Sequence, residues 1–282
     1  MSDPSKSSNP FSDRPWRDLT SADLGPATAV PSMLSTEETQ FYFWLTRHMA
    51  DVDGHLVDLG CFAGGSTAYL AEGNRAGGGK AKIFAFDRFH VSKKAKEAHL
   101  YSHGVAPFLG SNMLPLSQEL LAPWGPSIVF RKGRIEEQKW EEGSIAVLVQ
   151  DASKNADATA RMAEMFFPCL IPGVSVLVQQ DELHWKEPWA AVLMEQLKEC
   201  FEPLVHIPGG MMVYRCVQHV SEKAFQNGLD DMDDETMIAA LTKAKARLKD
   251  FGVGPKLDRQ IEGIRLNPGK RTAWSFKTRP PR

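Results

Sequence analysis

The feature of this 282-residue chain that most constrains its fold is an alternation of short apolar runs with stretches of helical spacing. The apolar runs are His55–Leu59, Ala81–Phe86, Ser127–Phe130, Ile145–Val149, Val174–Val178, Leu204–Ile207 and Met211–Cys216. Several of them are continuous and β-branched, which is typical of strands buried on both faces of a sheet. The helical stretches between them are Ser66–Ala71, Lys93–Tyr101, Ala156–Phe167 and Trp189–Phe201. This alternation predicts an α/β fold, a doubly wound and mostly parallel sheet of seven strands with helices on both faces.

The connections between the predicted strands refine this topology. Pro208-Gly209-Gly210 joins the last two strands, and three residues are too few for a parallel crossover, so we expect an antiparallel terminal hairpin. Residues 88–126 form a longer connection than the second and third strands require. Insertions at such an edge commonly shape the substrate side of a pocket, although an added helix packed on the sheet would also explain the length.

The two ends of the chain differ from this alternating region, which we place at residues 32–220 as the main domain. Residues 1–31 are rich in Ser, Pro and Asp and offer little apolar surface, so we expect a flexible segment in which only Trp16 docks. Residues 221–282 read as a C-terminal helical extension, with acidic residues early and basic residues late, as suits a helix dipole. From Lys270 onward we expect a poorly ordered basic tail.

Composition argues against several classes of protein. Lys and Arg number 33 against 35 Asp and Glu, a net charge of −2, which does not favour a dedicated nucleic-acid binder. The four cysteines lie far apart, which excludes a disulfide scaffold or a thiolate zinc site as the organising feature. No apolar run approaches the ~20 residues that span a bilayer, and no signal peptide is visible. We expect a cytoplasmic protein that binds neither membranes nor nucleic acid; a homo-oligomer is compatible with this composition.

The most informative motif is the turn after the first predicted strand, Val57-Asp58-Leu59-Gly60-Cys61-Phe62-Ala63-Gly64-Gly65-Ser66-Thr67. Its glycines allow the backbone to turn tightly and a ligand to approach closely. The spacing Asp-x-Gly-x-x-x-Gly differs from the Gly-x-Gly-x-x-Gly fingerprint of dinucleotide sites, and the Gly-Lys-Ser/Thr of a P-loop is absent. An acid at the start of the turn would repel a pyrophosphate but attract a positively charged ligand. A turn with no ligand is the alternative.

A second acid, Asp87, follows the strand residues Lys82-Ile83-Phe84-Ala85-Phe86. An acid at the carboxyl end of the second strand of a doubly wound sheet can bind a ribose diol through its two oxygens. A buried strand end is a costly place for an unpaired carboxylate, and a helix cap is the alternative role.

In this order, the motifs resemble those of class I S-adenosylmethionine-dependent methyltransferases. The set is completed by Gly133-Arg134-Ile135-Glu136, Val149-Gln150-Asp151-Ala152-Ser153-Lys154 and Leu170-Ile171-Pro172-Gly173. The resemblance covers about residues 33–217 and is strongest to small-molecule O-methyltransferases of the catechol and macrocin kind. It implies a Rossmann-like methyltransferase fold, S-adenosylmethionine as cofactor, and methyl transfer to a small-molecule acceptor at a hydroxyl oxygen. The macrocin-like branch also includes partners in hydroxylation, so a non-catalytic S-adenosylmethionine-binding partner or regulatory protein is the alternative.

The resemblance also implies roles for single residues. It places Asp58 at the amino end of the methionine, Ser66 at its carboxylate and Asp87 at the ribose. Gly133 and Arg134 would flank the adenine. The cofactor-binding residues expected from the resemblance are Asp58, Gly60, Cys61, Phe62, Gly64, Ser66, Asp87, Arg88, Gly133, Arg134, Asp151 and Ala152.

A third group of polar residues follows the fourth and fifth predicted strands, and both strand ends face the same crevice. In metal-dependent O-methyltransferases that the chain resembles, acids at these two places hold a divalent cation. Asp151, Asp181 and Glu182 could therefore supply oxygen ligands to Mg²⁺. Gln179 stands where the family acid usually lies, and hydrogen bonds or an ion pair are the alternative roles of Asp181 and Glu182.

His184 is the best candidate for a general base, because histidine titrates near neutral pH. A structural hydrogen bond is the alternative role for this side chain. Asp151 and Lys154 complete the expected catalytic set. The Asn/Asp-Pro-Pro-Tyr/Phe stretch of amino-methylating DNA enzymes is missing after the fourth strand, which disfavours a nucleic-acid acceptor. A sugar hydroxyl, a phenol, a polyketide and an amine all remain open as acceptors.

Overall fold

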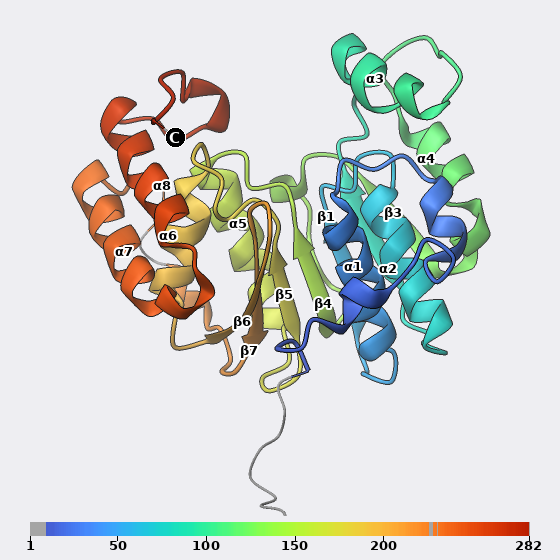
Figure 1. Ribbon diagram of the computed structural model, residues 1–282, viewed down its shortest axis with the longest axis horizontal. Coiled ribbons are helices and arrows are strands. Elements are labelled where there is room, and N and C mark those ends of the chain that lie inside the picture. The colour runs from blue at the N-terminus through green and yellow to red at the C-terminus, as the bar shows by residue number, and fades with distance from the viewer. Residues whose placement is uncertain (1–9, 226–227, 230, 282) are drawn as a thin grey trace, which may run out of the picture.

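The computed structural model describes residues 10–225, 228–229 and 231–281, and its centre is one seven-stranded sheet (Figure 1). The strands are β1 (His55–Leu59), β2 (Ile83–Asp87), β3 (Ile128–Lys132), β4 (Ile145–Gln150), β5 (Val176–Gln179), β6 (Phe201–Ile207) and β7 (Met211–Cys216). They lie in the order β3-β2-β1-β4-β5-β7-β6. β1 to β5 run parallel, whereas β7 pairs antiparallel with both β5 and β6. The doubly wound sheet and its terminal hairpin are therefore confirmed.

Helices cover both faces of this sheet. They are α1 (Thr36–His48), α2 (Gly65–Ala76), α3 (Lys93–His99), α4 (Leu114–Leu120), α5 (Ala156–Phe166), α6 (Pro188–Gln196), α7 (Asp234–Arg247) and α8 (Gly254–Leu266). α1 and α2 pack on one face and α5 to α8 on the other, while α3 and α4 lie in the long connection between β2 and β3 (Figure 1). None of the helices in the described ranges is long and apolar enough to cross a membrane.

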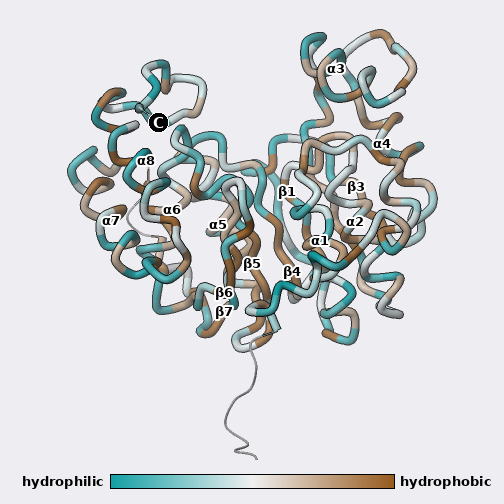
Figure 2. The backbone as a smooth tube through the Cα atoms, viewed as in Figure 1, coloured by the Kyte–Doolittle hydropathy of each residue, from teal (hydrophilic) through white to brown (hydrophobic). Residues whose placement is uncertain are grey.

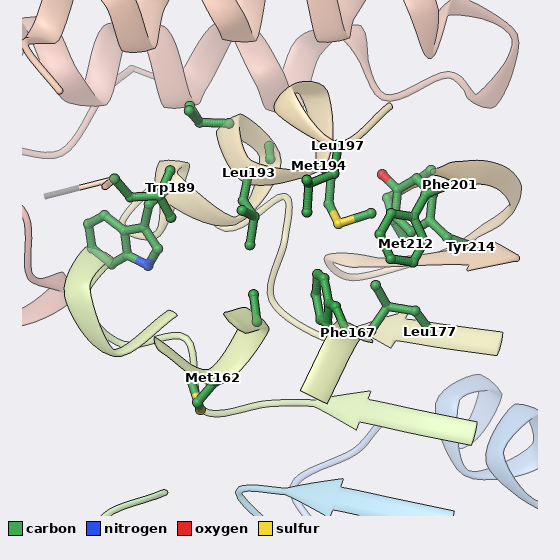
Figure 3. Close-up of a cluster of buried hydrophobic side chains, with 14 of the residues drawn as sticks. Met162, Phe167, Leu177, Trp189, Leu193, Met194, Leu197, Phe201, Met212 and Tyr214 are labelled. Carbon is green, nitrogen blue, oxygen red and sulfur yellow. The ribbon is translucent and has the colours of Figure 1, made fainter. Parts of the chain in front are cut away.

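Successive residues of the central strands point into two separate apolar cores. Val57 belongs to the core beneath α5 to α8, whereas its neighbour Leu56 belongs to the core beneath α1 and α2. Leu177 and Val178 of β5 divide in the same way. Figure 3 shows the first of these cores, and in Figure 2 β4 and β5 carry the hydrophobic colour along most of their length. Strands covered on both faces need continuous apolar sequences, which is the pattern found here.

The N-terminal segment packs onto α1 from residue 10 onward, so the prediction of a flexible segment is wrong for residues 10–31. The docking of Trp16 is confirmed: its ring lies 5.0 Å from that of Phe41, and the Phe11 ring lies 5.1 Å from that of Trp44. Both Phe11 and Trp16 are buried. The segment has few apolar residues, but they are large, and each aromatic side chain buries much surface. Residues 1–9 lie outside the described residues.

The C-terminal tail is also packed against the rest of the protein, contrary to the poor order that we expected. The backbone N–H of Ala273 donates to the carbonyl of Lys154 (2.9 Å), and that of Ala156 donates to the carbonyl of Arg271 (3.0 Å). Phe276 is buried beside α6. Residues 221–282, which we expected to be a helical extension, contain α7 and α8, and the tail that follows them crosses the loop between β4 and α5.

Candidate functional site

A cavity of about 1060 Å³ opens at the carboxyl ends of β1, β2, β4 and β5. This is where doubly wound sheets bind ligands, beside the point at which the strand order reverses. The volume lies at the upper end of the ~300–1,000 Å³ that is usual for small-molecule sites, so it can hold two ligands side by side. Of the expected cofactor-binding residues, those that line the cavity are Gly60, Phe62, Asp87, Arg88, Arg134, Asp151 and Ala152.

Asp58 lies fully buried beneath the turn that follows β1. Its Oδ2 atom accepts hydrogen bonds from Ser66 Oγ (2.7 Å) and Thr67 Oγ1 (2.6 Å). Its Oδ1 atom has no hydrogen-bond partner among the described residues. Burial raises the pKa of Asp58 to about 6. An unpartnered buried oxygen on a carboxylate is costly, so this position suits a ligand that brings a donor or a positive charge. Ser66, expected at the ligand carboxylate, donates to Asp58 instead.

The glycines of the turn let the backbone approach neighbouring parts of the protein. Gly60 and Gly64 have φ values of +100° and +104°. A Cβ atom on Gly60 would lie 2.8 Å from the carbonyl oxygen of Asp151, and one on Gly64 would lie 2.6 Å from a methyl carbon of Leu121. The tight turn is therefore as expected. The space that a side chain at Gly60 would need, however, is filled by the backbone after β4.

A small crevice adjoins the cavity beside this turn. Cys61 and Ser66 line it, together with Gly60 and the chain at residues 31–34. Neither Cys61 nor Ser66 lines the main cavity. Cys61 is buried, and burial raises the pKa of its thiol well above the usual value, so the thiol stays protonated at neutral pH.

Asp87 joins the first two strand ends through its carboxylate. Its Oδ2 accepts a hydrogen bond from the N–H of Phe62 (2.9 Å), and its Oδ1 accepts one from the N–H of Phe89 (2.6 Å). Burial raises the pKa of Asp87. A carboxylate oxygen can accept more than one hydrogen bond, so both oxygens keep capacity for ligand hydroxyls on the cavity side.

The residues after β3 form the far wall of the cavity. Arg134 and Glu136 line it and are joined by an ion pair of 2.6 Å, with Ile135 between them. Gly133 does not line the cavity; its N–H donates to the carbonyl of Asp87 (3.0 Å) and so ties the third strand end to the second.

The loops after β4 and β5 bring three carboxylates to one lysine. Lys154 Nζ lies 2.6 Å from Asp181 Oδ2, 3.3 Å from Glu187 Oε2 and 3.6 Å from Asp151 Oδ1. We call these four residues the Lys154 cluster. Burial raises the pKa of Glu187 to about 7 and that of Asp151 well above its usual range. Desolvation opposes the charge on Lys154, but the nearby carboxylates outweigh it and raise the pKa of the lysine, which stays charged.

The expected Mg²⁺ ligands are not brought together. Glu182 is buried in the core, where its Oε1 accepts a hydrogen bond from the hydroxyl of Tyr214 (2.6 Å). Asp151 and Asp181 do face one another across the cluster, but the ammonium of Lys154 lies between them. In the part of the chain that the structure describes, no three His, Cys, Asp or Glu side chains are placed to hold a metal ion. The predicted ligand set is therefore wrong in Glu182, and the remaining residues do not fit a metal.

His184 lies behind the Lys154 cluster and does not line the cavity. Its Nδ1 is 3.8 Å from Glu187 Oε1 and has no hydrogen-bond partner among the described residues. Burial lowers the pKa of His184, so the ring is neutral at neutral pH. The structure does not bring this candidate base to the cavity wall, whereas Asp151 and Lys154 do line it.

Several residues of the site were missed by the sequence analysis. Glu187, which belongs to the Lys154 cluster but does not line the cavity, gave no signal, because it lies six residues beyond Asp181 in an irregular loop. Trp274 lines the cavity from the tail with 61% of its surface exposed, and nothing in the sequence around it points to a site. The other cavity-lining residues that were not expected are Met33, Leu34, Ile135, Glu136, Asn155, Ala158 and Gln180.

Comparison with solved structures identifies the fold. The chain is similar to the O-methyltransferase NovP, with a TM-score of 0.52 and 14% identity over 66% of this chain and 82% of that one. At lower TM-scores it is similar to the SAH-bound methyltransferase PaMTH1 of Podospora anserina (0.47, 16% identity, 74% and 88% covered) and to the calicheamicin methyltransferase CalS11 (0.46, 17%, 69% and 91%). No family model and no curated protein matches the chain. The likeness to NovP and the strand order together show the Rossmann-like methyltransferase fold.

Proposed function

We propose that this chain, which has the class I methyltransferase fold, binds S-adenosylmethionine and transfers its methyl group to a hydroxyl oxygen of a small molecule. The observation that carries the proposal is the meeting of the β1 turn, Asp87 and Asp151 at one cavity of about 1060 Å³. That volume has room for both cofactor and acceptor. On this proposal residues 32–220 form the cofactor-binding domain, 88–126 its substrate-side insertion and 221–282 the C-terminal extension.

The residues around the cavity suit the parts of S-adenosylmethionine. Asp58 lies beneath the turn and does not line the cavity itself, but its unpartnered Oδ1 would suit the ammonium group of the methionine portion. Asp87 keeps acceptor capacity for the ribose hydroxyls, and the wall at Arg134 and Ile135 would flank the adenine. When bound, the cofactor supplies a methyl group on a positively charged sulfur.

For transfer to a hydroxyl, the chain must hold the acceptor oxygen in line and remove its proton. Asp151 lines the cavity, and burial raises the pKa of its carboxyl, which makes it the best-placed group to take that proton. Lys154 is also at the wall and stays charged, so it would stabilise negative charge on the oxygen rather than act as a base. Mg²⁺ has no part in this reaction scheme, because the residues present do not fit it.

Calorimetric titration with S-adenosylhomocysteine tests the proposal. We expect the wild type to bind it and not to bind NAD. Asp87→Ala should weaken binding by roughly 1.5–3 kcal/mol, the usual effect of losing a charged hydrogen-bond partner. Asp258→Ala is the matched control, because this exposed acid on α8 pairs with Lys245 and does not line the cavity. Binding of NAD but not of S-adenosylhomocysteine would refute the proposal.

An assay of methyl transfer distinguishes an enzyme from a non-catalytic S-adenosylmethionine-binding protein with the same fold. We expect label from methyl-labelled S-adenosylmethionine to appear in at least one acceptor of a panel of phenols, sugars and polyketides. Cofactor binding without any transfer across that panel would favour the non-catalytic alternative. We also propose a cytoplasmic location, in line with the four free cysteines of the described chain.

A further inference from the structure

We infer that the ammonium of Lys154 takes the place of a divalent cation, so that this chain assembles its acceptor site without a metal. The carboxylates around it come from two loops: Asp151 follows β4, whereas Asp181 and Glu187 lie at the two ends of the loop between β5 and α6. All three lie within 3.6 Å of Lys154 Nζ. Three acidic groups this close together would repel one another without a cation at their centre.

The distances within the cluster are those of an ammonium site. Mg²⁺ requires oxygen ligands at about 2.0–2.1 Å in octahedral order. Here the carboxylate oxygens lie 2.6–3.6 Å from Lys154 Nζ, the range of charge-assisted hydrogen bonds and close ion pairs. A metal ion would have to displace the lysine before these oxygens could close around it.

The backbone of Lys154 is held as firmly as its side chain. Its carbonyl accepts a hydrogen bond from the N–H of Ala273 in the C-terminal tail (2.9 Å), and its own N–H donates to the carbonyl of Ala152 (2.8 Å). The adjoining residue, Asn155, forms a β-bridge with Thr272. These hydrogen bonds fix the backbone position of Lys154, from which its side chain extends to the three carboxylates.

One face of the lysine remains open to the cavity. The side chain of Lys154 is 44% exposed, and both it and Asp151 line the cavity wall. The role that we infer for Lys154 rests on the proposed function. Lys154 is a positioning residue, which holds Asp151 in place and presents a fixed positive charge to the acceptor oxygen. A bound metal ion would present positive charge to the acceptor oxygen, and the ammonium of Lys154 can supply that charge in its place.

Mn²⁺ binding, followed by electron paramagnetic resonance of the full-length protein, tests the inference without any acceptor. We expect the wild type to show no specific Mn²⁺ site at millimolar metal. Lys154→Ala, and Lys154→Met as a variant that keeps the apolar stem, should each bind one Mn²⁺ at a metal concentration at least about tenfold below the highest at which the wild type shows no site, because the carboxylates lose their cation. Lys154→Arg should not gain a site.

Two further variants locate the effect. Lys186→Ala removes a nearby lysine that lies over the ring of Trp185, outside the cluster, and should gain no Mn²⁺ site. Adding Asp181→Ala to Lys154→Ala should abolish the gained site. Thermal melts establish that each variant is folded.

A tight Mn²⁺ site in the wild type would overturn the inference, and this measurement needs no variant to fold. Folded lysine variants that gain no Mn²⁺ site would overturn it as well. Failure of the wild type to bind S-adenosylhomocysteine would instead refute the proposed function and leave the Mn²⁺ result standing. The two proposals therefore fail in distinguishable ways.

Discussion

Replacing Asp58 by asparagine should make the fold less sensitive to pH while weakening ligand binding. Asp58 is fully buried, and burial raises the pKa of its carboxyl from 3.8 to about 6. The ionised form is thus disfavoured in the folded protein relative to the unfolded chain. The substitution keeps the shape of the side chain but removes the proton that is lost on titration.

The magnitude follows from that difference in pKa. Because the pKa is higher in the folded protein, the protonated carboxyl stabilises the fold at low pH, and this stabilisation is lost as the pH rises through about 6. The full contribution corresponds to about 3 kcal/mol of unfolding free energy. About half of it remains near pH 5 and almost none near pH 7.5.

Urea denaturation at these two pH values measures the effect. Relative to wild type, Asp58→Asn should gain on the order of 1 kcal/mol of unfolding free energy, about half of the full contribution, between roughly pH 5 and pH 7.5. The new amide places an unpaired donor at the Oδ1 position, which costs ~1–3 kcal/mol at every pH, so the test is the change with pH and not the absolute stability. The same variant should bind S-adenosylhomocysteine at least about tenfold more weakly. An unchanged difference between the two proteins at both pH values would refute the reasoning from burial.

Other substitutions test the packing around the site. Gly60→Val should lower the unfolding free energy by about 2–4 kcal/mol in urea, since φ is positive and a Cβ would lie 2.8 Å from the carbonyl of Asp151; an unchanged midpoint would contradict this. Phe276→Ala should cost about 3–5 kcal/mol because the ring is buried. Trp274→Ala, in the same tail but exposed, should change stability by less than about 0.5 kcal/mol. Equal losses from these two variants would mean that the tail is not anchored at Phe276. His184→Ala should leave the calorimetric affinity for S-adenosylhomocysteine within about twofold, because His184 lies outside the cavity wall. A larger loss would place it in the binding site.

The sheet could be predicted from the sequence because burial on both faces leaves a strong local pattern. Runs such as Ile145–Val149 contain no polar residue, so they are readily predicted as strands and not as loops. The short Pro208-Gly209-Gly210 link allows only a hairpin between the last two strands. The ends of the chain were harder to predict. Trp16 and Phe276 each fix a segment that is otherwise polar, and average composition does not reveal a single well-placed aromatic side chain.

The candidate site divides in a similar way. Asp87 and Asp151 could be predicted because Asp87 ends β2 and Asp151 directly follows β4, where position in the chain determines position in space. Beyond β5 the chain is irregular, and spacing does not show which of three acids turns toward Lys154. Asp181 and Glu187 do so, while Glu182, next to Asp181, faces Tyr214 in the core. The direction of each side chain there depends on the turn geometry and on α6, which no local pattern describes.

The backbone pairing between residues 271–273 and 154–156 sets an order of events during synthesis. The loop after β4 leaves the ribosome more than a hundred residues before the strand-like tail that covers it. At ~5–20 residues per second, that loop waits roughly 6–24 s for its partner. During this interval Lys154 lacks the hydrogen bond from Ala273, and the cavity lacks the wall that Trp274 supplies. A nascent chain therefore holds all seven strands well before its cavity is complete, and a product released before residue 271 would lack both the wall at Trp274 and the buried side chain of Phe276.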